Sequence, residues 1–413
     1  MSVKHMSEWF VQPHYASEES KQPFFLAPAD LAMLSVHYIQ KGLFFTKPPE
    51  AANNPHFMDS LLEKLKHSLA LALVHFYPLS GRLVTKQEQD PPLYLVYVDC
   101  TNSPGAKFIH ASLDLSISEI LSPIDVPLVV QSLFDHDRAI NHDAHTTSLL
   151  TIQVTELVDG VFIGLSMNHC LVDGTSYWHF FNTWSEIFQA QEKKFPISEI
   201  SRPPVLDRWF PEGHGPIISL PFKGPEEFID RFEAPTLRER MFHFSSESIA
   251  KLKSKANSEC KEQQNLFLPG LVCSYVEDNH SSTWSASRSG NQLQIGCQQQ
   301  RKNRPTAVSE LLWELNLSDQ VRRCQSCLRY FDPFSVMMGS GPRFDMYGNE
   351  FGMGKAVTLR SGYANKFSGK VSSFQGRQAG SIDLEVCLPP EAMTALESDQ
   401  EFMEVASVPN YDD

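Results

Sequence analysis

His169 and Asp173 are the residues of this chain whose types and spacing could do chemistry, because an imidazole and a carboxylate lie four positions apart. A histidine side chain has an ordinary pKa of about 6.5, so near pH 7 it is mostly neutral and can accept a proton from an attacking hydroxyl or amine. Taken alone the pair is weak evidence, since the alternative is a polar loop that caps a helix.

The flanking segments predict a strand before the pair and a buried helix after it. Alternating apolar residues indicate the strand: Val161, Ile163, Leu165 and Met167. The run Asp173-Gly174-Thr175-Ser176 supplies turn and N-cap residues. Aromatic residues at helical spacing indicate the helix: Tyr177, Phe181, Trp184 and Phe188, widened by Trp178, Phe180 and Ile187. We therefore predict that His169 and Asp173 lie on a loop held between two buried elements.

Four further segments accompany this run. They are Asp30–Gln40, His75–Leu83 with the sequence His-Phe-Tyr-Pro-Leu-Ser-Gly-Arg-Leu, Tyr347–Lys355 with the sequence Tyr-Gly-Asn-Glu-Phe-Gly-Met-Gly-Lys, and Gly380–Met393. In this order and at these distances they resemble the BAHD family of plant acyl-CoA-dependent acyltransferases. The resemblance assigns them to the family's first strand, its "YPLAGR" signature, its Asp-Phe-Gly-Trp-Gly signature, and its closing strand and helix.

The third segment departs from the family pattern, since Glu350 replaces Asp and Met353 replaces Trp. In the family this signature lies away from the active-site channel and is structural, so the departure bears on the substrate more than on the chemistry. The variant resembles a group close to the hydroxycinnamoyltransferases.

The resemblance implies both a fold and a reaction. The expected fold is α/β, with two similar-sized mixed-sheet halves like those of chloramphenicol acetyltransferase, joined by a crossover linker. The expected reaction moves an acyl group from an acyl-CoA thioester to a hydroxyl or amine of a small plant metabolite. His169 would be the general base, and Asp173 would point away from it and hold the loop by pairing with an arginine. Acyl-CoA is then a co-substrate, no cofactor is bound permanently, and the protein is a monomer.

Composition agrees with a soluble intracellular enzyme. The 413 residues, 42% of them hydrophobic, suggest two domains. Neither an apolar leader nor a run of about 20 apolar residues is present, so we expect a cytoplasmic protein without a membrane span. Eight cysteines read as reduced thiols, and Cys324-x-x-Cys327 is a single pair, so no metal site is expected. The formal charge of -14 argues against nucleic acid as a partner.

We predict an N-terminal half at residues 1–195, a crossover linker at 196–240 and a C-terminal half at 241–413. The linker begins in a stretch rich in proline and turn residues. Met241–Phe244 is typical of a short strand, and Ser245–Ser248 of an N-cap before a helix. In the resembled family this helix start contributes to the coenzyme A phosphate site, which makes Lys251, Lys253 and Ser254 candidates. The alternative is that these lysines form a solvated helix face.

Residues 261–328 do not fit the rest of the chain. They are polar, show neither helical nor strand period and match no family segment. A flexible insertion is one interpretation. The other is a one-nucleotide frame shift over about Leu266 to Leu317, because shifted codons permitted for Tyr275–Ser281 and for Gln298–Asn316 can encode two family motifs. The chain then skips a family segment and returns to frame near Tyr330, so the second half is expected to be incomplete.

Three functions stay open. The first is the acyltransferase, and the second is a catalytically inactive or regulatory relative, because the arginine expected to pair with Asp173 would lie in the erased segment. The third is an unrelated binding module.

Overall fold

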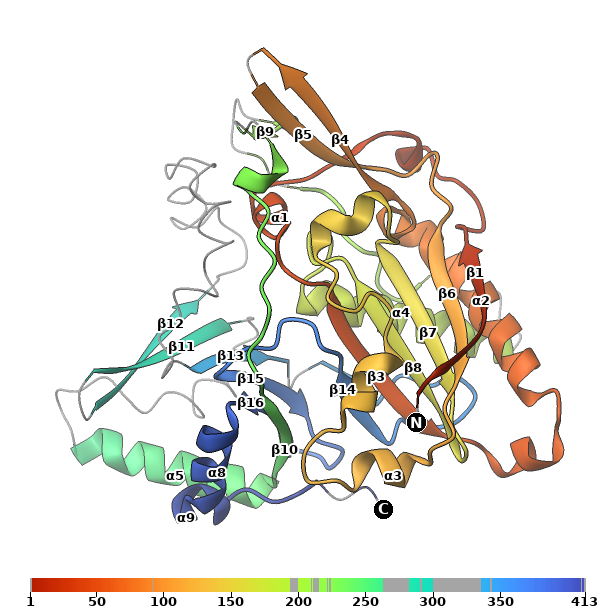
Figure 1. Cartoon of the computed structure of the whole chain (residues 1–413). Helices are drawn as coiled ribbons and strands as arrows, with labels where there is room; N and C mark the ends of the chain where they lie inside the picture. The colour runs from red at the N-terminus through yellow and green to blue at the C-terminus, as the bar shows by residue number, and fades with distance from the viewer. Residues whose placement is uncertain are drawn as a thin grey trace.

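The structure is a computed structural model of the chain that describes residues 2–90, 92–193, 200–208, 210, 215–220, 222, 224–262, 282–289, 292–299, 336–341, 344–409 and 411. It confirms the α/β class: Figure 1 shows two main mixed sheets, with helices packed on them and a smaller sheet at one end. No described helix is both long and apolar enough to cross a bilayer.

Three sheets contain the described strands. The first runs in the order β1 (Lys4–Val11), β6 (Ala106–Ser112), β7 (Leu150–Glu156), β8 (Gly160–Met167), β3 (Ile39–Thr46) and β14 (Thr358–Ser361). The second runs β10 (Arg238–Phe244), β16 (Ile382–Leu388), β15 (Lys370–Gln375), β13 (Val336–Ser340), β11 (Ser282–Ser289) and β12 (Gln292–Gln299). The small sheet has β2 (Phe24–Phe25), β5 (Pro92–Asp99) and β4 (Arg82–Gln89), and β9 (Ser219–Leu220) pairs with β5.

The described helices are α1 (Pro28–Ala32), α2 (Phe57–His75), α3 (Ile117–Leu121), α4 (Gly174–Glu192), α5 (Ser246–Glu262), α8 (Pro390–Ser398) and α9 (Gln400–Met403). Short 3-10 turns lie at Glu19–Lys21, Pro49–Asn53, Tyr77–Ser80, Leu128–Leu133, Asn141–His145 and Pro225–Glu227.

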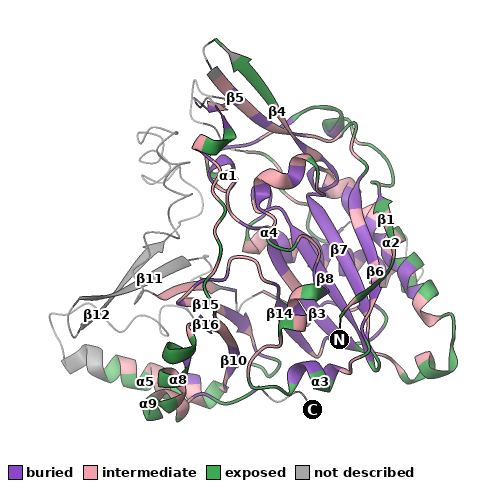
Figure 2. Ribbon diagram, in the orientation of Figure 1, coloured by how far each residue is buried: buried purple, intermediate pink, exposed green. Residues whose placement is uncertain are grey.

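The first sheet is covered on both faces. Successive residues of β3 point to opposite sides, so Leu43 and Phe45 join the main core while Phe44 packs with Phe162 in a smaller cluster. Ile117 of α3 closes that smaller cluster, and α2 and α4 contribute to the main core. The predicted strand before His169 is confirmed as β8, which is buried along its whole length (Figure 2).

The predicted aromatic helix is confirmed as α4, and it ties distant segments together. Its Trp184 donates an indole hydrogen bond to Ser68 Oγ of α2 at 2.9 Å. Phe351, from Tyr347–Lys355, is fully buried and lies with its ring centroid 4.7 Å from that of Trp184. Ser185 Oγ donates to the Glu350 carbonyl at 3.1 Å and accepts the Glu350 N–H at 2.8 Å. Residues 347–355 therefore pack against α4, as a structural signature would.

The second sheet has one apolar and one polar face. Its apolar face forms a cluster with residues of α5 and α8, including Val371, Val386, Ile249 and Met393. In Figure 1 these helices and α9 gather on one side of the sheet. On the other face, Glu385 accepts hydrogen bonds from Ser361 Oγ of β14 at 2.7 and 2.8 Å. The polar face of the second sheet therefore meets the first sheet.

The expectation that Asp30–Gln40 is a strand is wrong for most of its length. Pro28 opens the short helix α1, and Asp30 accepts the backbone N–H of Ala27 at 2.9 Å, which caps the start of this helix. The strand begins only at Ile39. Proline and aspartate at a helix start therefore decide the local structure over the apolar run that follows.

The expectation that no strand forms within residues 261–328 is also wrong in part. β11 and β12 pair antiparallel, and β11 pairs with β13. Strands pair through backbone groups, so they do not require an alternating apolar pattern. The intervening dipeptide Gly290-Asn291 is a hairpin signal that the sequence does contain. Tyr275–Ser281, Cys324, Cys327 and Tyr330 lie outside the described residues.

Strands from outside the predicted first half pair with strands inside it. β14 belongs by sequence to the predicted second half, yet it pairs antiparallel with β3 at the edge of the first sheet. Within the predicted linker, β9 pairs with β5 of the small sheet. The boundaries at residues 195 and 240 stay predictions, and in the described chain strands cross them.

Candidate active site

Two buried asparagines hold the backbone around His169. Asn141 Oδ1 accepts the His169 N–H at 2.7 Å, and Asn141 Nδ2 donates to the Met33 carbonyl at 2.8 Å. Asn168 Nδ2 donates to the Asn141 carbonyl at 2.9 Å, and its Oδ1 accepts the Cys170 N–H at 3.0 Å. Neither asparagine is exposed to solvent. Because buried polar groups are costly to leave unpaired, these bonds fix the loop in one geometry.

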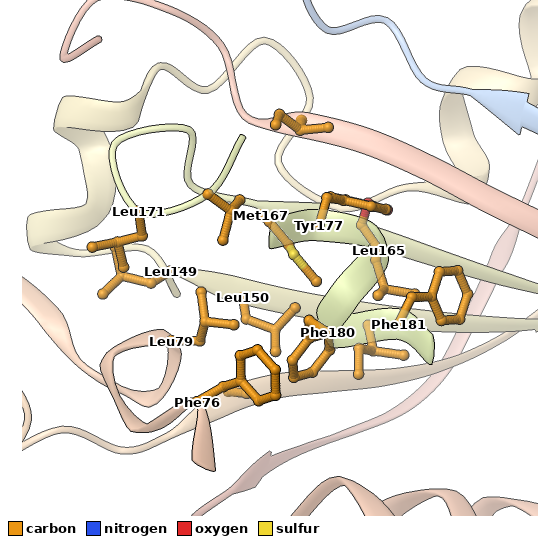
Figure 3. Packing of buried hydrophobic residues seen from close by; sticks show 14 of the residues in the cluster. Phe76, Leu79, Leu149, Leu150, Leu165, Met167, Leu171, Tyr177, Phe180 and Phe181 are labelled. Atoms are coloured by element: carbon orange, nitrogen blue, oxygen red, sulfur yellow. The ribbon is translucent and has the colours of Figure 1, made fainter. Parts of the chain in front are cut away.

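Apolar residues on either side of His169 anchor the same loop. Met167 precedes it and Leu171 follows it, and both belong to the buried cluster of Figure 3 together with Leu149 and Tyr177. The loop is therefore held by packing at both ends, as predicted, while the side chain of His169 itself is half-buried.

Asp173 caps α4. Its carboxylate accepts the backbone N–H of Ser176 at 2.8 Å, which is the N-cap role predicted for this turn. The side chain is exposed, and no ion pair joins it to a lysine or arginine among the residues that the structure describes. Asp173 therefore has a backbone N–H as its partner, and the expected arginine partner does not occur among the described residues.

An arginine that the sequence did not single out holds the His169 loop instead. Arg208, in the linker, pairs with Asp30 at 2.8 Å and donates to the Leu171 carbonyl at 3.1 Å. The structure thus joins the linker, α1 and the loop. A single arginine in an irregular segment gives no sequence signal for such a role.

The surroundings of His169 favour its neutral form. Burial is the largest effect and lowers its pKa below 6.5. The Asp173 carboxylate acts in the opposite direction, and the ammonium groups of Lys41 and Lys370 lower the pKa further. A histidine in this setting is ready to accept a proton near pH 7.

Sequence reasoning also missed Lys41 and Lys370. Lys41 lies in β3, and its Nζ is 5.9 Å from the ring centroid of Trp178 in α4 and 5.3 Å from that of Phe374 in β15. Lys370 is the first residue of β15. The two therefore lie where the first sheet, α4 and the second sheet meet. A charged residue inside the apolar run Ile39–Phe45 was an available signal, since lysine is rarely buried without a reason.

Residues 75–83 support the site from a distance. α2 ends at His75, and Tyr77–Ser80 forms a 3-10 turn, as the helix-closing signature predicts. Arg82 then donates to the Gly105 carbonyl at 3.1 Å and to Ser148 Oγ at 2.8 Å. The adjacent Leu149 carbonyl accepts the Asn168 N–H at 2.9 Å. Arg82 therefore holds the segment Ser148-Leu149, to which the His169 loop is hydrogen-bonded.

The coenzyme A candidates lie on α5, which begins as predicted, with Ser245 Oγ accepting the Ser248 N–H at 3.1 Å. Lys251 is exposed and pairs with Glu404 at 3.5 Å. Lys253 is half-buried and Ser254 is exposed. These positions suit either a solvated face or a phosphate site, and the structure does not bring them into the cluster around His169.

Two other features lie apart from this cluster. No group of three histidine, cysteine or acidic residues suited to a metal occurs in the described ranges. A hollow of about 380 Å³ lies along α4 and is lined by residues that include Ser185, Gln189 and Gly348. Its lining does not include His169, Lys41 or Lys370.

Comparison with known proteins identifies the family. A family model described as "Transferase family" matches residues 1–315 and 298–403. An uncharacterised acetyltransferase of Arabidopsis thaliana is 30% identical, covering 97% of this chain and 99% of its own. The BAHD acyltransferase DCR of the same plant is 26% identical, covering 98% and 93%. The chain belongs to the BAHD acyltransferase family.

The fold agrees with this assignment. The crystal structure of vinorine synthase superposes with a TM-score of 0.61 over 99% of both chains, at 18% sequence identity. The chain is thus related to acyl-CoA-dependent acyltransferases, for which acyl-CoA is the co-substrate.

Proposed function

We propose that this protein transfers an acyl group from acyl-CoA to a hydroxyl or amine of a small plant metabolite, with His169 as general base. The observation that carries the proposal is the setting of His169, whose backbone is fixed by Asn141 and whose pKa is lowered by burial. A neutral imidazole on a fixed backbone, in a half-buried site, is what proton abstraction during attack on a thioester requires.

The reaction follows from this geometry. The imidazole accepts the proton of the acceptor as its oxygen or nitrogen bonds to the thioester carbonyl carbon, which becomes a tetrahedral oxyanion. The oxyanion collapses, the carbon–sulfur bond breaks, and the imidazolium returns the proton to the leaving thiolate. Base catalysis of this kind typically contributes about 10²–10⁴-fold.

Lys251, Lys253 and Ser254 remain our candidates for the coenzyme A phosphates. They lie near the start of α5, where helix N-terminal amides and ammonium groups favour an anion. A cytoplasmic, monomeric protein with no nucleic-acid partner also remains a prediction, to be checked by fractionation and by scattering in solution.

The direct test is release of free coenzyme A thiol from a panel of acyl-CoA donors incubated with plant hydroxyl and amine acceptors. We expect release to depend on both donor and acceptor. Thiol release that does not require any acceptor would indicate a hydrolase and contradict the proposal.

Asp173 should act on the pH profile separately from stability. Asp173→Asn keeps a good N-cap but removes the charge that raises the pKa of His169, so the acid limb of kcat against pH should move to lower pH. Asp173→Ala also loses the cap, so its free energy of unfolding should be lower by about 1 kcal/mol. Urea unfolding and pH profiles of the two variants check this, and equal acid limbs in Asp173→Asn and the unmodified chain would contradict it.

A second candidate function is that of a weak or inactive BAHD relative. The family match comes in two parts that meet at residues 298–315, inside the stretch 261–328. The alignment with the Arabidopsis acetyltransferase extends over 459 positions, more than the 413 residues of this chain. The second candidate rests on this longer alignment and on the overlap of the two family matches within residues 261–328, although the first match itself extends to residue 315.

A further inference from the structure

Lys41 and Lys370, here called the lysine pair, are half-buried cations from the two main sheets, and Lys41 lies opposite Leu165 on β8, the strand that leads to His169. Lys41 comes from the first sheet and Lys370 from the second. Burial lowers the pKa of Lys41 to about 8 and also lowers that of Lys370, and each ammonium group acts on His169. The pair thus places positive charge beside the proposed base.

Neither lysine has a counter-ion in the described chain. No carboxylate lies within ion-pair distance of either Nζ among the described residues, whereas Lys366 nearby has Glu239 at 2.5 Å. Glu385 acts on both lysines electrostatically, but its carboxylate accepts two hydrogen bonds from Ser361. Lys366 is therefore paired with a carboxylate, whereas no carboxylate among the described residues pairs with Lys41 or Lys370.

The surroundings keep room for the lysine pair. Lys370 Nζ runs over Gly339 of β13, where a Cβ would lie 2.8 Å from it. The indole N–H of Trp178, one of the rings beside Lys41, is buried and has no hydrogen-bond partner in the described part of the chain. Two half-buried positive charges and an indole N–H without an acceptor are costly in free energy unless a bound anion neutralises the charges and accepts the hydrogen bonds.

The anion must be close to the reacting atoms. The phosphates of coenzyme A lie at the far end of the pantetheine arm, away from the thioester carbonyl that the imidazole of His169 must reach. A group beside His169 therefore belongs to the acyl chain or to the acceptor. Resting on the proposed function, we infer that the lysine pair binds a carboxylate carried by the acyl group or by the acceptor.

The experiment compares ligands that differ by one carboxylate. Malonyl-CoA against acetyl-CoA tests the acyl group, and shikimate against methyl shikimate, with coenzyme A present, tests the acceptor. Binding is measured by calorimetry on the full chain and on Lys41→Met and Lys370→Met. Lys86→Met is the control, because Lys86 is also a cation beside an aromatic ring, 5.5 Å from the Tyr97 centroid, but is exposed on β4.

In one of the two ligand comparisons, we expect the ligand with the carboxylate to bind at least about tenfold more tightly than the ligand without it, since charge-assisted hydrogen bonds are strong. That ratio should fall toward one in Lys41→Met and in Lys370→Met and persist in Lys86→Met. The ligand pair that responds identifies the substrate carrying the carboxylate. The inference would be overturned if the ligands with and without the carboxylate bound equally in both comparisons. It would also be overturned if the affinity ratio were unchanged in Lys41→Met and in Lys370→Met.

Two readouts keep the inference independent of folding and of turnover. Discrimination by the unmodified chain does not depend on any variant, and removal of the Lys41 charge should raise the pKa of His169 in an NMR titration. Binding needs no catalysis. A chain that discriminates malonyl-CoA but releases no thiol under any condition would contradict the proposed function and support the lysine pair, whereas turnover without discrimination would do the reverse.

Discussion

Replacing His169 by alanine, in a version of the chain with the proposed frame shift reversed, is expected to lower kcat by about 100-fold or more, because the acceptor would have to lose its proton to water. The change should affect kcat more than binding of acyl-CoA, since the imidazole acts on the acceptor. Steady-state measurement of thiol release, with calorimetry of coenzyme A binding, separates the two effects.

The matched control is His75→Ala. His75 ends α2, is half-buried, and has a pKa lowered by burial in the same direction as that of His169. Its loss should leave kcat nearly unchanged. Activity that survives His169→Ala in a folded protein would remove His169 as the base, and an equal fall in both variants would show that stability rather than proton transfer was measured.

The second large effect is expected on reversing the frame shift that we infer for residues 266–317. A version in which the one-nucleotide shift is reversed and the skipped segment is returned should gain soluble yield and turnover. We expect its kcat to enter the ordinary enzyme range of about 1–10³ s⁻¹, while the present chain stays far below it. Soluble yield and thiol release of the two proteins are compared side by side.

The reason is the energetics of the second sheet. Apolar surface contributes about 25 cal/mol per Å² when buried, and a domain is stable by only about 5 to 15 kcal/mol, so losing several buried strands would exceed this margin. Sequencing the transcript across codons 260 to 330 is the independent control. Equal yield and equal turnover of both proteins would rule out the frame shift as a cause of weak activity.

Sequence alone predicted the elements whose signals are local. The alternation in β8, the aromatic spacing of α4 and the serines before α5 each report short-range geometry, and each is confirmed. Local signals also misled at Asp30–Gln40, where helix-start residues precede the apolar run of β3.

The parts of the site that sequence could not predict depend on contacts between distant segments. Asn141 reaches His169 across 28 positions, and Arg208 reaches Leu171 across 37. Lys41 and Lys370 come from two different sheets, and Lys41 reaches the ring of Phe374 in the second sheet. Contacts between distant segments leave no periodic pattern in the sequence, so coordinates were needed to find that Lys41 and Lys370 lie in the same region.

The pairing of β14 with β3 has a consequence for synthesis on the ribosome. β3 leaves the ribosome well before the partner for its free edge, Thr358–Ser361. Until then the edge of β3 from Lys41 to Phe44 offers unpaired backbone groups, to which other chains can pair. A nascent or truncated polypeptide that stops before residue 358 therefore depends on chaperones, and the first half is a poor candidate for independent expression.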